Sequence, residues 1–490
     1  MRRIPWIGMI LVLSAITLLF RFTLPIESPL LLKTGFSRNA SQTVTTCNPP
    51  ALEDKIETQR TPAGDTRITR VIAHIHGFTV LENVYLRNGT LFVVHNDSAS
   101  LGTASQASGY PSRKSMLSKN VKLRNGTNFY PTDEEMSFVS SSDANARLGS
   151  FVQRIEGVTV LVYDSTQFLG HLYHWWGEII LGAWRIYSTI DQRQVTHPSI
   201  PHLWSDTQPM RFILPFSKNG EWRDNPGLDG PLIRAAFPSA SLEESGYWAD
   251  LRALGTTVVF DRLVLVNRHS AHSHPNGSLW FKMLAGAATV NVKKGFWEPM
   301  RRSLIKGVLG YVPPVGSRGA VLGHDEDEAK PLVTYVSRQG GAKFRKLANE
   351  YHESLVTSLK ALESEGVIKF HEAHFERNTI REQVELAAKT TIMIGVHGNG
   401  LTHQLWMPSS PWSTVMEILR PTAYLFDYEM LARNVGHRHY AVWNDTLVTY
   451  PEGTYYGPGI NYAEDFHGKD LPVWGPAVAQ AIRERLAEQH

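Results

Sequence analysis

Residues 391–402 read TIMIGVHGNGLT, an apolar and β-branched run that ends in a glycine-rich turn. A strand made almost entirely of apolar residues is typical of the centre of a parallel sheet covered on both faces. Glycines in the turn let the backbone approach a ligand, and the free N–H groups of a following helix can hold a phosphate. A tight strand-to-helix turn with a hydrogen-bonded structural histidine is the alternative. The candidate ligand-binding residues of this block are His397, Gly398, Asn399, Gly400 and Leu401.

The segments on either side of this run alternate between strand and helix patterns. We predict strands at 333–337, 367–371 and 414–419, and helices at about 344–363 and 378–389. This alternation requires right-handed crossovers and produces an open, doubly wound α/β sheet. We therefore assign residues 331–490, with a helix at the carboxy terminus, to one α/β lobe.

A second α/β lobe is predicted at residues 71–310, joined to the first by a linker at 311–330. Two lobes joined by a linker imply a cleft, and ligands of open parallel sheets bind at the carboxyl ends of strands. The acidic run 325–328 is expected to be a solvated loop of the linker. Within the amino-terminal lobe the patterns predict strands at 158–163, 211–216 and 257–266 and helices near 168–189 and 295–309.

Charged side chains follow two of the predicted strands in the carboxy-terminal lobe. Arg338 comes directly after the strand at 333–337, and Arg345 comes seven residues later. Guanidinium groups at such points suit a diphosphate, which they neutralise with forked hydrogen bonds. Glu417, near the end of the strand at 414–419, is expected to accept hydrogen bonds from two ribose hydroxyls.

A polar cluster in the amino-terminal lobe has helical spacing. His171, His174 and Glu178 stand at i, i+3 and i+7, which places them on one face of a helix that also carries two tryptophans. A carboxylate beside a histidine predicts a general base that faces a hydroxyl acceptor. The alternatives are a polar strip packed into the core and a metal site, although the pattern is not HExxH and no fourth ligand is apparent. The candidate bases and acids are Glu178, His174 and Asp164, and the acceptor side is assigned to His171, Trp175 and Asp206.

Composition excludes several classes of protein. A chain of 490 residues with 42% hydrophobic content can form sizeable cores, so intrinsic disorder of the whole chain is excluded. The formal net charge of +3 is too small to indicate nucleic-acid binding. Cys47 is the only cysteine, which excludes an intrachain disulfide and a cysteine-based zinc site. It leaves open a cross-link between two chains, and with it a homodimer.

The amino terminus predicts a membrane anchor. Two arginines precede an apolar run, which gives a cytoplasmic tail at 1–3, a signal-anchor helix at 4–24 and a stem at 25–70. Arginines before the span favour a cytoplasmic amino end, so the rest of the chain is expected in the secretory lumen as a single-pass type II protein. A cleaved signal peptide is the alternative.

Six Asn-x-Ser/Thr sequons agree with a luminal location. The predicted anchor, stem and luminal domain suit the Golgi membrane, with the endoplasmic reticulum as the alternative; the final residues, LAEQH, are not a retention tetrapeptide. The predicted glycosylation sites are Asn39, Asn88, Asn96, Asn125, Asn276 and Asn444.

Taken in order, these motifs resemble those of glycosyltransferase family 61 between about Val158 and Arg420. His171 and Asn399 depart from the residues common in the family, which are Asn and Ala, and residues 409–410 replace a turn that contains Pro or Gly. The matching segments are 171–178 (HLYHWWGE), 203–206 (LWSD), 336–338 (VSR), 345, 349–350, 383, 394–402 (IGVHGNGLT), 408 and 417–418.

The resemblance implies a GT-B-like pair of Rossmann-like lobes and a nucleotide-sugar donor held mainly by the carboxy-terminal lobe. It also implies inversion at the anomeric carbon during transfer to a hydroxyl of a glycan or glycoprotein. The donor is expected to be a UDP-sugar carrying xylose or N-acetylglucosamine. No cofactor is expected to be obligatory, because arginines and backbone amides can stabilise the leaving diphosphate; a divalent cation, Mn²⁺ or Mg²⁺, is the alternative.

Two other functions compete with this interpretation. A catalytically inactive luminal glycan-binding or scaffold protein would keep the fold and is suggested by His171 in place of Asn. A metal-dependent hydrolase would use His171, His174 and Glu178 as zinc ligands.

Overall fold

The computed structural model describes residues 66–96, 110–120, 128–194, 208–320, 322, 330–340 and 345–488. The chain divides into two compact units, Met1–Arg60 and Thr61–His490, and all described residues belong to the second. Within these ranges no helix is both long and apolar enough to cross a membrane. The anchor expected at 4–24, and the tail before it, lie outside the described residues, as does nearly all of the stem.

The amino-terminal lobe is built on a mixed sheet with the order β4-β3-β2-β8-β5-β6-β7, to which β1 adds by pairing with β2. The pairs β5/β8, β5/β6, β6/β7 and β3/β4 are parallel, whereas β2 runs antiparallel to its neighbours. The strands are β1 (Arg70–Ile75), β2 (Phe78–Arg87), β3 (Thr90–His95), β4 (Met136–Ser140), β5 (Val152–Val162), β6 (Pro209–Ile213), β7 (Ser241–Glu243) and β8 (Thr257–Val266).

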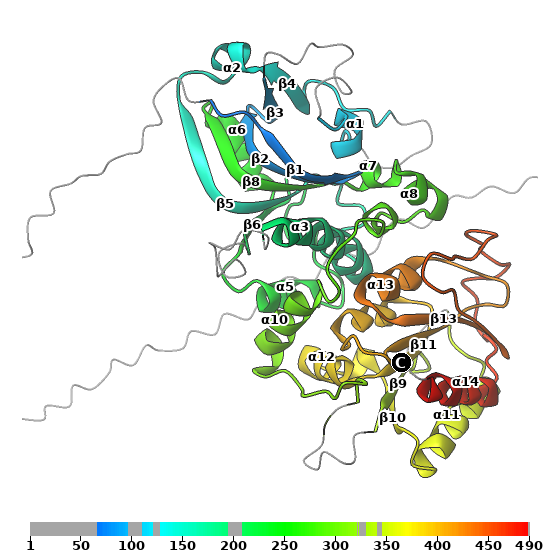
Figure 1. Cartoon of the computed structure of the whole chain (residues 1–490). Coiled ribbons are helices and arrows are strands. Elements are labelled where there is room, and N and C mark those ends of the chain that lie inside the picture. The colour runs from blue at the N-terminus through cyan, green and yellow to red at the C-terminus, as the bar shows by residue number, and fades with distance from the viewer. Residues whose placement is uncertain are drawn as a thin grey trace, which may run out of the picture. The chain divides into compact units, whose positions relative to one another are not determined.

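Helices cover this sheet and connect it to the second lobe. Figure 1 shows α3, α5 and α10 between the amino-terminal sheet and the elements of the carboxy-terminal lobe. The helices are α1 (Arg113–Met116), α2 (Ser141–Leu148), η1 (Tyr173–Ile180), α3 (Leu181–Gln194), α5 (Asp229–Ala236), α6 (Ser245–Ala253), α7 (Arg268–His272), α8 (Pro275–Trp280), α9 (Leu284–Ala287) and α10 (Glu298–Leu309).

The carboxy-terminal lobe contains the predicted doubly wound sheet. Its order is β10-β9-β11-β12-β13-β14, with β10 to β13 parallel and β14 antiparallel at the edge. The elements are β9 (Leu332–Val336), α11 (Asn349–Ser364), β10 (Lys369–Ala373), η3 (Phe375–Arg377), α12 (Ile380–Lys389), β11 (Ile392–Val396), η4 (Asn399–Trp406), β12 (Thr414–Ile418), α13 (Asp427–Val435), β13 (Arg438–Trp443), β14 (Thr446–Val448) and α14 (Gly475–Ala487).

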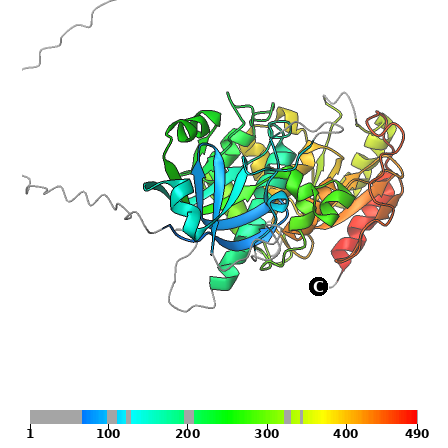
Figure 2. The same ribbon diagram turned by 90° about the horizontal axis from the view of Figure 1, so that it is seen from above.

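Strand β11 is fully buried, as the sequence predicts for a central strand. Ile392, Ile394 and Val396 pack into an apolar cluster with α11 and α14, whereas Met393 faces the opposite cluster with α12 and η4. Successive side chains of a strand point to opposite faces, so a continuous apolar run serves both layers. In Figure 2, α14 lies at the end of this unit opposite the blue strands of the amino-terminal sheet.

One apolar cluster extends across both lobes. It joins η1, α3, α5 and α10 with α12, η4 and α13, and the rings of Trp176 and Trp406 meet edge to face at 5.0 Å. The described part of the linker also packs on the second lobe, because the Thr391 hydroxyl donates to the Gly319 carbonyl at 2.8 Å. The two α/β sheets are consistent with GT-B-like lobes.

Two expected helices differ in their winding. The helix expected at 168–189 begins as the π-helix η1 and becomes α-helical only at Leu181. The turn after β11 opens a 3₁₀ helix, η4. π-Helical segments are rare in proteins, and those that occur are often found at functional sites.

Candidate functional site

The carboxyl ends of β9 and β11 form the switch point of the second sheet. From β9 the chain crosses to β10 on one side and then returns to β11 on the other side, so the connections diverge between these two strands. Open α/β sheets bind ligands at this point. Arg338 follows β9 and His397 follows β11, so the fold brings together the two segments that the sequence singles out.

Gly398 allows the arginine to approach the turn. Its backbone φ is +155°, and a Cβ atom on it would lie 2.4 Å from Nη1 of Arg338. A side chain at this position would displace the guanidinium group. The positive φ of the turn therefore favours glycine, and the missing Cβ also leaves room for the guanidinium group.

Arg338 and Arg345 form a cationic pair at this edge. Burial and the nearby charge of Arg345 lower the pKa of Arg338. Arg345 adopts a left-handed conformation, donates its backbone N–H to Gly468 at 2.8 Å and holds its guanidinium over Phe466. Its Nε has no hydrogen-bond partner within the described part of the chain. Two half-buried guanidinium groups side by side suit a doubly charged anion.

Glu417 has a different role from the one expected of it. Its Oε1 receives a hydrogen bond from Nδ1 of His397, and its Oε2 lies 2.8 Å from Nε2 of His439. Burial alone would raise the pKa of Glu417, but these two histidines outweigh it and lower the pKa to about 2. The carboxylate is fully buried, with both oxygens engaged, so we replace the expected ribose contact by an orienting contact to His397.

The glycine-rich turn also connects the lobes. Oδ1 of Asn399 accepts the backbone N–H of Tyr173 at 3.1 Å. Leu401 is a core residue, and its N–H donates to Gly398, so neither its side chain nor its amide is free for a phosphate. A Cβ on Gly400 would lie 2.8 Å from Val336, which indicates close packing of the turn on β9.

In the amino-terminal lobe, the π-helix η1 brings His174 and Glu178 together. Nδ1 of His174 lies 2.6 Å from Oε2 of Glu178, whereas the histidine side chain keeps 24% of its surface exposed. Tyr173 is the next link to the second lobe, because its ring lies 5.5 Å from that of Tyr428, which in turn lies 5.2 Å from His397. The two motifs that the sequence separates by more than 200 residues are thus neighbours.

A buried arginine organises the carboxylates, and the sequence analysis did not identify it. Arg268 donates Nη1–H to Glu178 and Nε–H to Asp164, the latter at 3.1 Å. Burial would raise the pKa of Glu178, but Arg268 and His174 hold it well below its ordinary value. Met283 N–H donates to the second oxygen at 3.2 Å. Glu178 therefore favours its ionised form, and its carboxylate is buried with both oxygens already hydrogen-bonded, so it is poorly placed to take a substrate proton.

Asp164 is bound by the same arginine, but its pKa shifts in the opposite direction. Burial raises its pKa against the opposing charge of Arg268, and its Oδ1 accepts the N–H of Ser165. Arg268 comes two residues after the carboxyl end of β8. The rule that ligand-binding residues follow strand ends, which singled out Arg338, therefore applies to Arg268 as well. A second pair missed by the sequence is Lys282 with Asp427, at 2.9 Å.

The three residues predicted to face the acceptor differ in their position in the structure. His171 is exposed, with its ring 5.0 Å from that of His174. Trp175 is fully buried and packs on Trp222, so it belongs to the core and the expected acceptor contact is wrong. Asp206 lies outside the described residues.

The geometry argues against the zinc interpretation. Across the ranges that the structure describes, no group of three or more His, Cys, Asp or Glu side chains could hold a metal ion. Both oxygens of Glu178 are bound, one of them by a cationic guanidinium group, which would repel a divalent cation. The acidic run 325–328 lies outside the described residues.

Four of the predicted sequons lie in the structure. Asn88 and Asn96 are exposed, whereas Asn276 and Asn444 are partly buried. Asn39 and Asn125 lie outside the described residues.

Comparison with known proteins assigns the chain to a family. The model described as "Glycosyltransferase 61" matches residues 172–416, half of the chain, and this range includes η1, Arg338 and the glycine-rich turn. The EGF domain-specific O-linked N-acetylglucosamine transferase of Drosophila melanogaster is 32% identical over 128 residues, 26% of this chain and 22% of that protein. Its Mus musculus counterpart is 30% identical over 149 residues, 30% of this chain and 26% of that protein. The matches thus span about a quarter of these relatives, and the family model shows that this chain belongs to glycosyltransferase family 61.

Proposed function

We propose that the protein transfers a sugar from a UDP-sugar to a hydroxyl of a glycan or glycoprotein, with inversion at the anomeric carbon. The observation that carries this proposal is the meeting of two motifs across the Tyr173–Asn399 hydrogen bond. On one side stand the arginines of the switch point, and on the other stands a partly exposed histidine held by a buried carboxylate.

His174 is the proposed base. With Nδ1–H donated to Glu178, its Nε2 can accept the proton of the acceptor hydroxyl while that oxygen attacks the anomeric carbon. The bond from the anomeric carbon to the diphosphate breaks on the opposite face. Arg338 and Arg345 neutralise the charge that develops on the leaving UDP.

Glu178 and Arg268 are positioning residues in this scheme. The arginine keeps Glu178 ionised, and the carboxylate fixes the tautomer and the orientation of the imidazole. The arrangement needs no obligatory metal, and Mn²⁺ or Mg²⁺ remains the alternative to be tested with a chelator.

The donor sugar is proposed to be N-acetylglucosamine or xylose. The names of the two relatives support testing UDP-N-acetylglucosamine first. We also propose a type II protein of the Golgi membrane with a luminal catalytic part, on the basis of the apolar run at 4–24 and the sequons. The endoplasmic reticulum is the second candidate.

The test is UDP or GDP release by the purified full-length chain, offered a panel of UDP- and GDP-sugars with and without chelator. We expect UDP release from one donor, and release that survives the chelator. Silence toward every donor, without thermal stabilisation by UDP, would contradict the proposal and favour a protein that binds glycans without transfer.

A further inference from the structure

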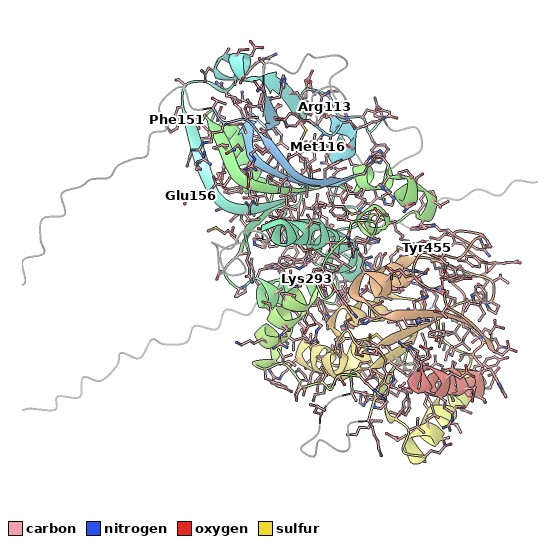
Figure 3. All side chains as sticks on the ribbon, in the orientation of Figure 1. Arg113, Met116, Phe151, Glu156, Lys293 and Tyr455 are labelled. Atoms are coloured by element: carbon pink, nitrogen blue, oxygen red, sulfur yellow. The ribbon has the colours of Figure 1, made fainter. Side chains whose placement is uncertain are left out.

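A cavity of about 910 Å³ opens far from the proposed donor site. Its lining includes residues 409–411 before β12 and residues 436–439 at the start of β13. These are the amino ends of strands whose carboxyl ends face the donor site. Residues of the segment 288–298 in the amino-terminal lobe form the opposite wall. Two of the lining residues, Lys293 and Tyr455, are labelled in Figure 3.

The wall from the amino-terminal lobe is cationic. Lys293 and Lys294 are exposed, and no described carboxylate pairs with either of them. The guanidinium group of Arg185 donates only to backbone carbonyls, at 2.7 Å to Val290, 2.9 Å to Ala287 and 3.1 Å to Ala288. By contrast, the cavity arginines 301, 433 and 485 are each paired with a glutamate. Three positive charges on one wall are therefore left without a countercharge.

The opposite wall contains the exposed carboxylate of Glu452 and, apart from it, two buried neutral acceptor atoms. Asn434 and His437 are 6% and 5% exposed, and both line the cavity. The Asn434 amide donates to Met430, and Nε2 of His437 donates to the Gln404 carbonyl. Oδ1 of Asn434 and Nδ1 of His437 then remain as acceptors without a hydrogen-bond partner among described residues. A buried acceptor without a partner costs stability, so such atoms indicate a missing donor.

We infer that this cavity binds an acidic saccharide, with its carboxylate against Arg185, Lys293 and Lys294 and its hydroxyls donating to Asn434 and His437. The cationic wall excludes a metal ion, and an inorganic anion would leave the neutral acceptors unmatched. Burial lowers the pKa of His437 to about 4, which keeps Nδ1 an acceptor at neutral pH. The volume falls within the range of small-ligand sites, about 300–1,000 Å³. Tyr450 lines the same cavity and offers aromatic surface to the C–H face of a sugar, whereas the ring of Tyr455 already packs against Trp280 and Arg433.

The inference is tested by calorimetric titration of the full-length chain in detergent. The probe is an unsulfated chondroitin hexasaccharide, which carries carboxylates and hydroxyls, and its carboxyl-reduced neutral counterpart is the control ligand. We expect Lys293→Ala/Lys294→Ala to weaken binding about tenfold or more and Asn434→Ala about fivefold. The matched control Lys360→Ala/Lys369→Ala, which removes two exposed lysines elsewhere, should bind as the unmodified chain does. Unchanged thermal unfolding identifies folded variants.

Four results would overturn the inference. The first is absence of binding by the hexasaccharide, and the second is equal weakening by the control substitution. The third is equally tight binding of inorganic phosphate or of the carboxyl-reduced ligand. If UDP binds and loses its affinity in the Lys293→Ala/Lys294→Ala variant, the cavity is a nucleotide site and the saccharide assignment is wrong. None of these readings depends on sugar transfer, so failure here is separable from failure of the proposed activity.

Discussion

At the residue scale, the chemistry of the site depends on which group can take a proton. Glu178 is the candidate base whose ionised form is favoured most strongly. Its two oxygens, however, already interact with Arg268, His174 and the backbone N–H of Met283. The side chain of His174 is partly exposed, and its contact with the Glu178 carboxylate fixes its orientation. The sequence named both residues as bases and could not separate their roles, because Arg268 lies 90 positions away in the chain.

We expect His174→Gln to lower kcat by about 10²–10⁴-fold with little change in the KM of the donor. The reason is that Gln keeps a polar side chain but cannot accept the proton from the acceptor hydroxyl. Steady-state UDP release in the presence of acceptor measures this. The exposed His371 provides the control substitution, His371→Gln, which should leave kcat unchanged. A His174→Gln enzyme with ordinary kcat would remove the base assignment.

A second residue-scale prediction concerns Asp229 in α5. Both carboxyl oxygens are buried and find no partner within the described ranges, and burial together with nearby Asp224 raises the pKa of Asp229 to about 9. The folded pKa lies above the unfolded value of 3.8, so the neutral carboxyl favours folding at low pH. This contribution is complete below about pH 4 and is lost as the pH rises toward 9.

Asp229→Asn should therefore raise Tm by roughly 3–6 °C at pH 8 and by almost nothing at pH 4, because Asn cannot ionise. Thermal unfolding of the full-length chain at the two pH values is the measurement. Asp250→Asn, at an exposed aspartate, is the matched control and should show no such difference between the two pH values. A gain of equal size at both pH values would mean that ionisation of Asp229 is not the cause.

At the element scale, the backbone geometry of the turn after β11 leaves room for Arg338 at the proposed donor site. Gly398→Ala should weaken UDP binding by about tenfold or more, since its Cβ would displace the guanidinium of Arg338. Titration with UDP measures this. Gly457→Ala serves as the control, because a Cβ there meets nothing within 4 Å. Retention of full UDP affinity by Gly398→Ala would show that this close approach is irrelevant to the donor.

The sequence predicted those elements whose signal is local. Strands β9, β11 and β12 stand out as short apolar runs, and all three lie within a residue of their predicted positions. β2 was missed because Glu82 and Asn83 interrupt its apolar run. Glu82 is tolerated there because it pairs with Arg262 of β8 at 2.7 Å, a partner 180 positions away. Likewise, periodicity predicted a helix at η1 but could not show its π-helical winding.

The candidate site was predictable to the extent that it follows strand ends. Arg338 and His397 were found by that rule, and Arg268 satisfies the same rule after β8. The burial of Trp175 and the two histidines around Glu417 were not predictable, because they depend on packing between segments that are distant in sequence.

At the scale of the whole molecule, a continuous apolar core and several polar contacts hold the lobes of Thr61–His490 against each other. Two of these contacts are the hydrogen bond from Tyr173 N–H to Asn399 and the ion pair Lys282–Asp427. Both lie beside the two motifs, so the position of His174 relative to the switch-point arginines depends on the fit between lobes. The basic cavity also takes its two walls from different lobes.

The most direct test of the account is calorimetric titration of UDP into the full-length chain and into its Arg338→Ala variant, with Arg377→Ala, at an exposed arginine, as the matched control. We expect UDP binding by the unmodified chain and by Arg377→Ala, and loss of that binding in an Arg338→Ala protein with unchanged thermal unfolding. Equal UDP affinity in all three proteins would contradict the claim that the switch point of the second sheet holds the donor.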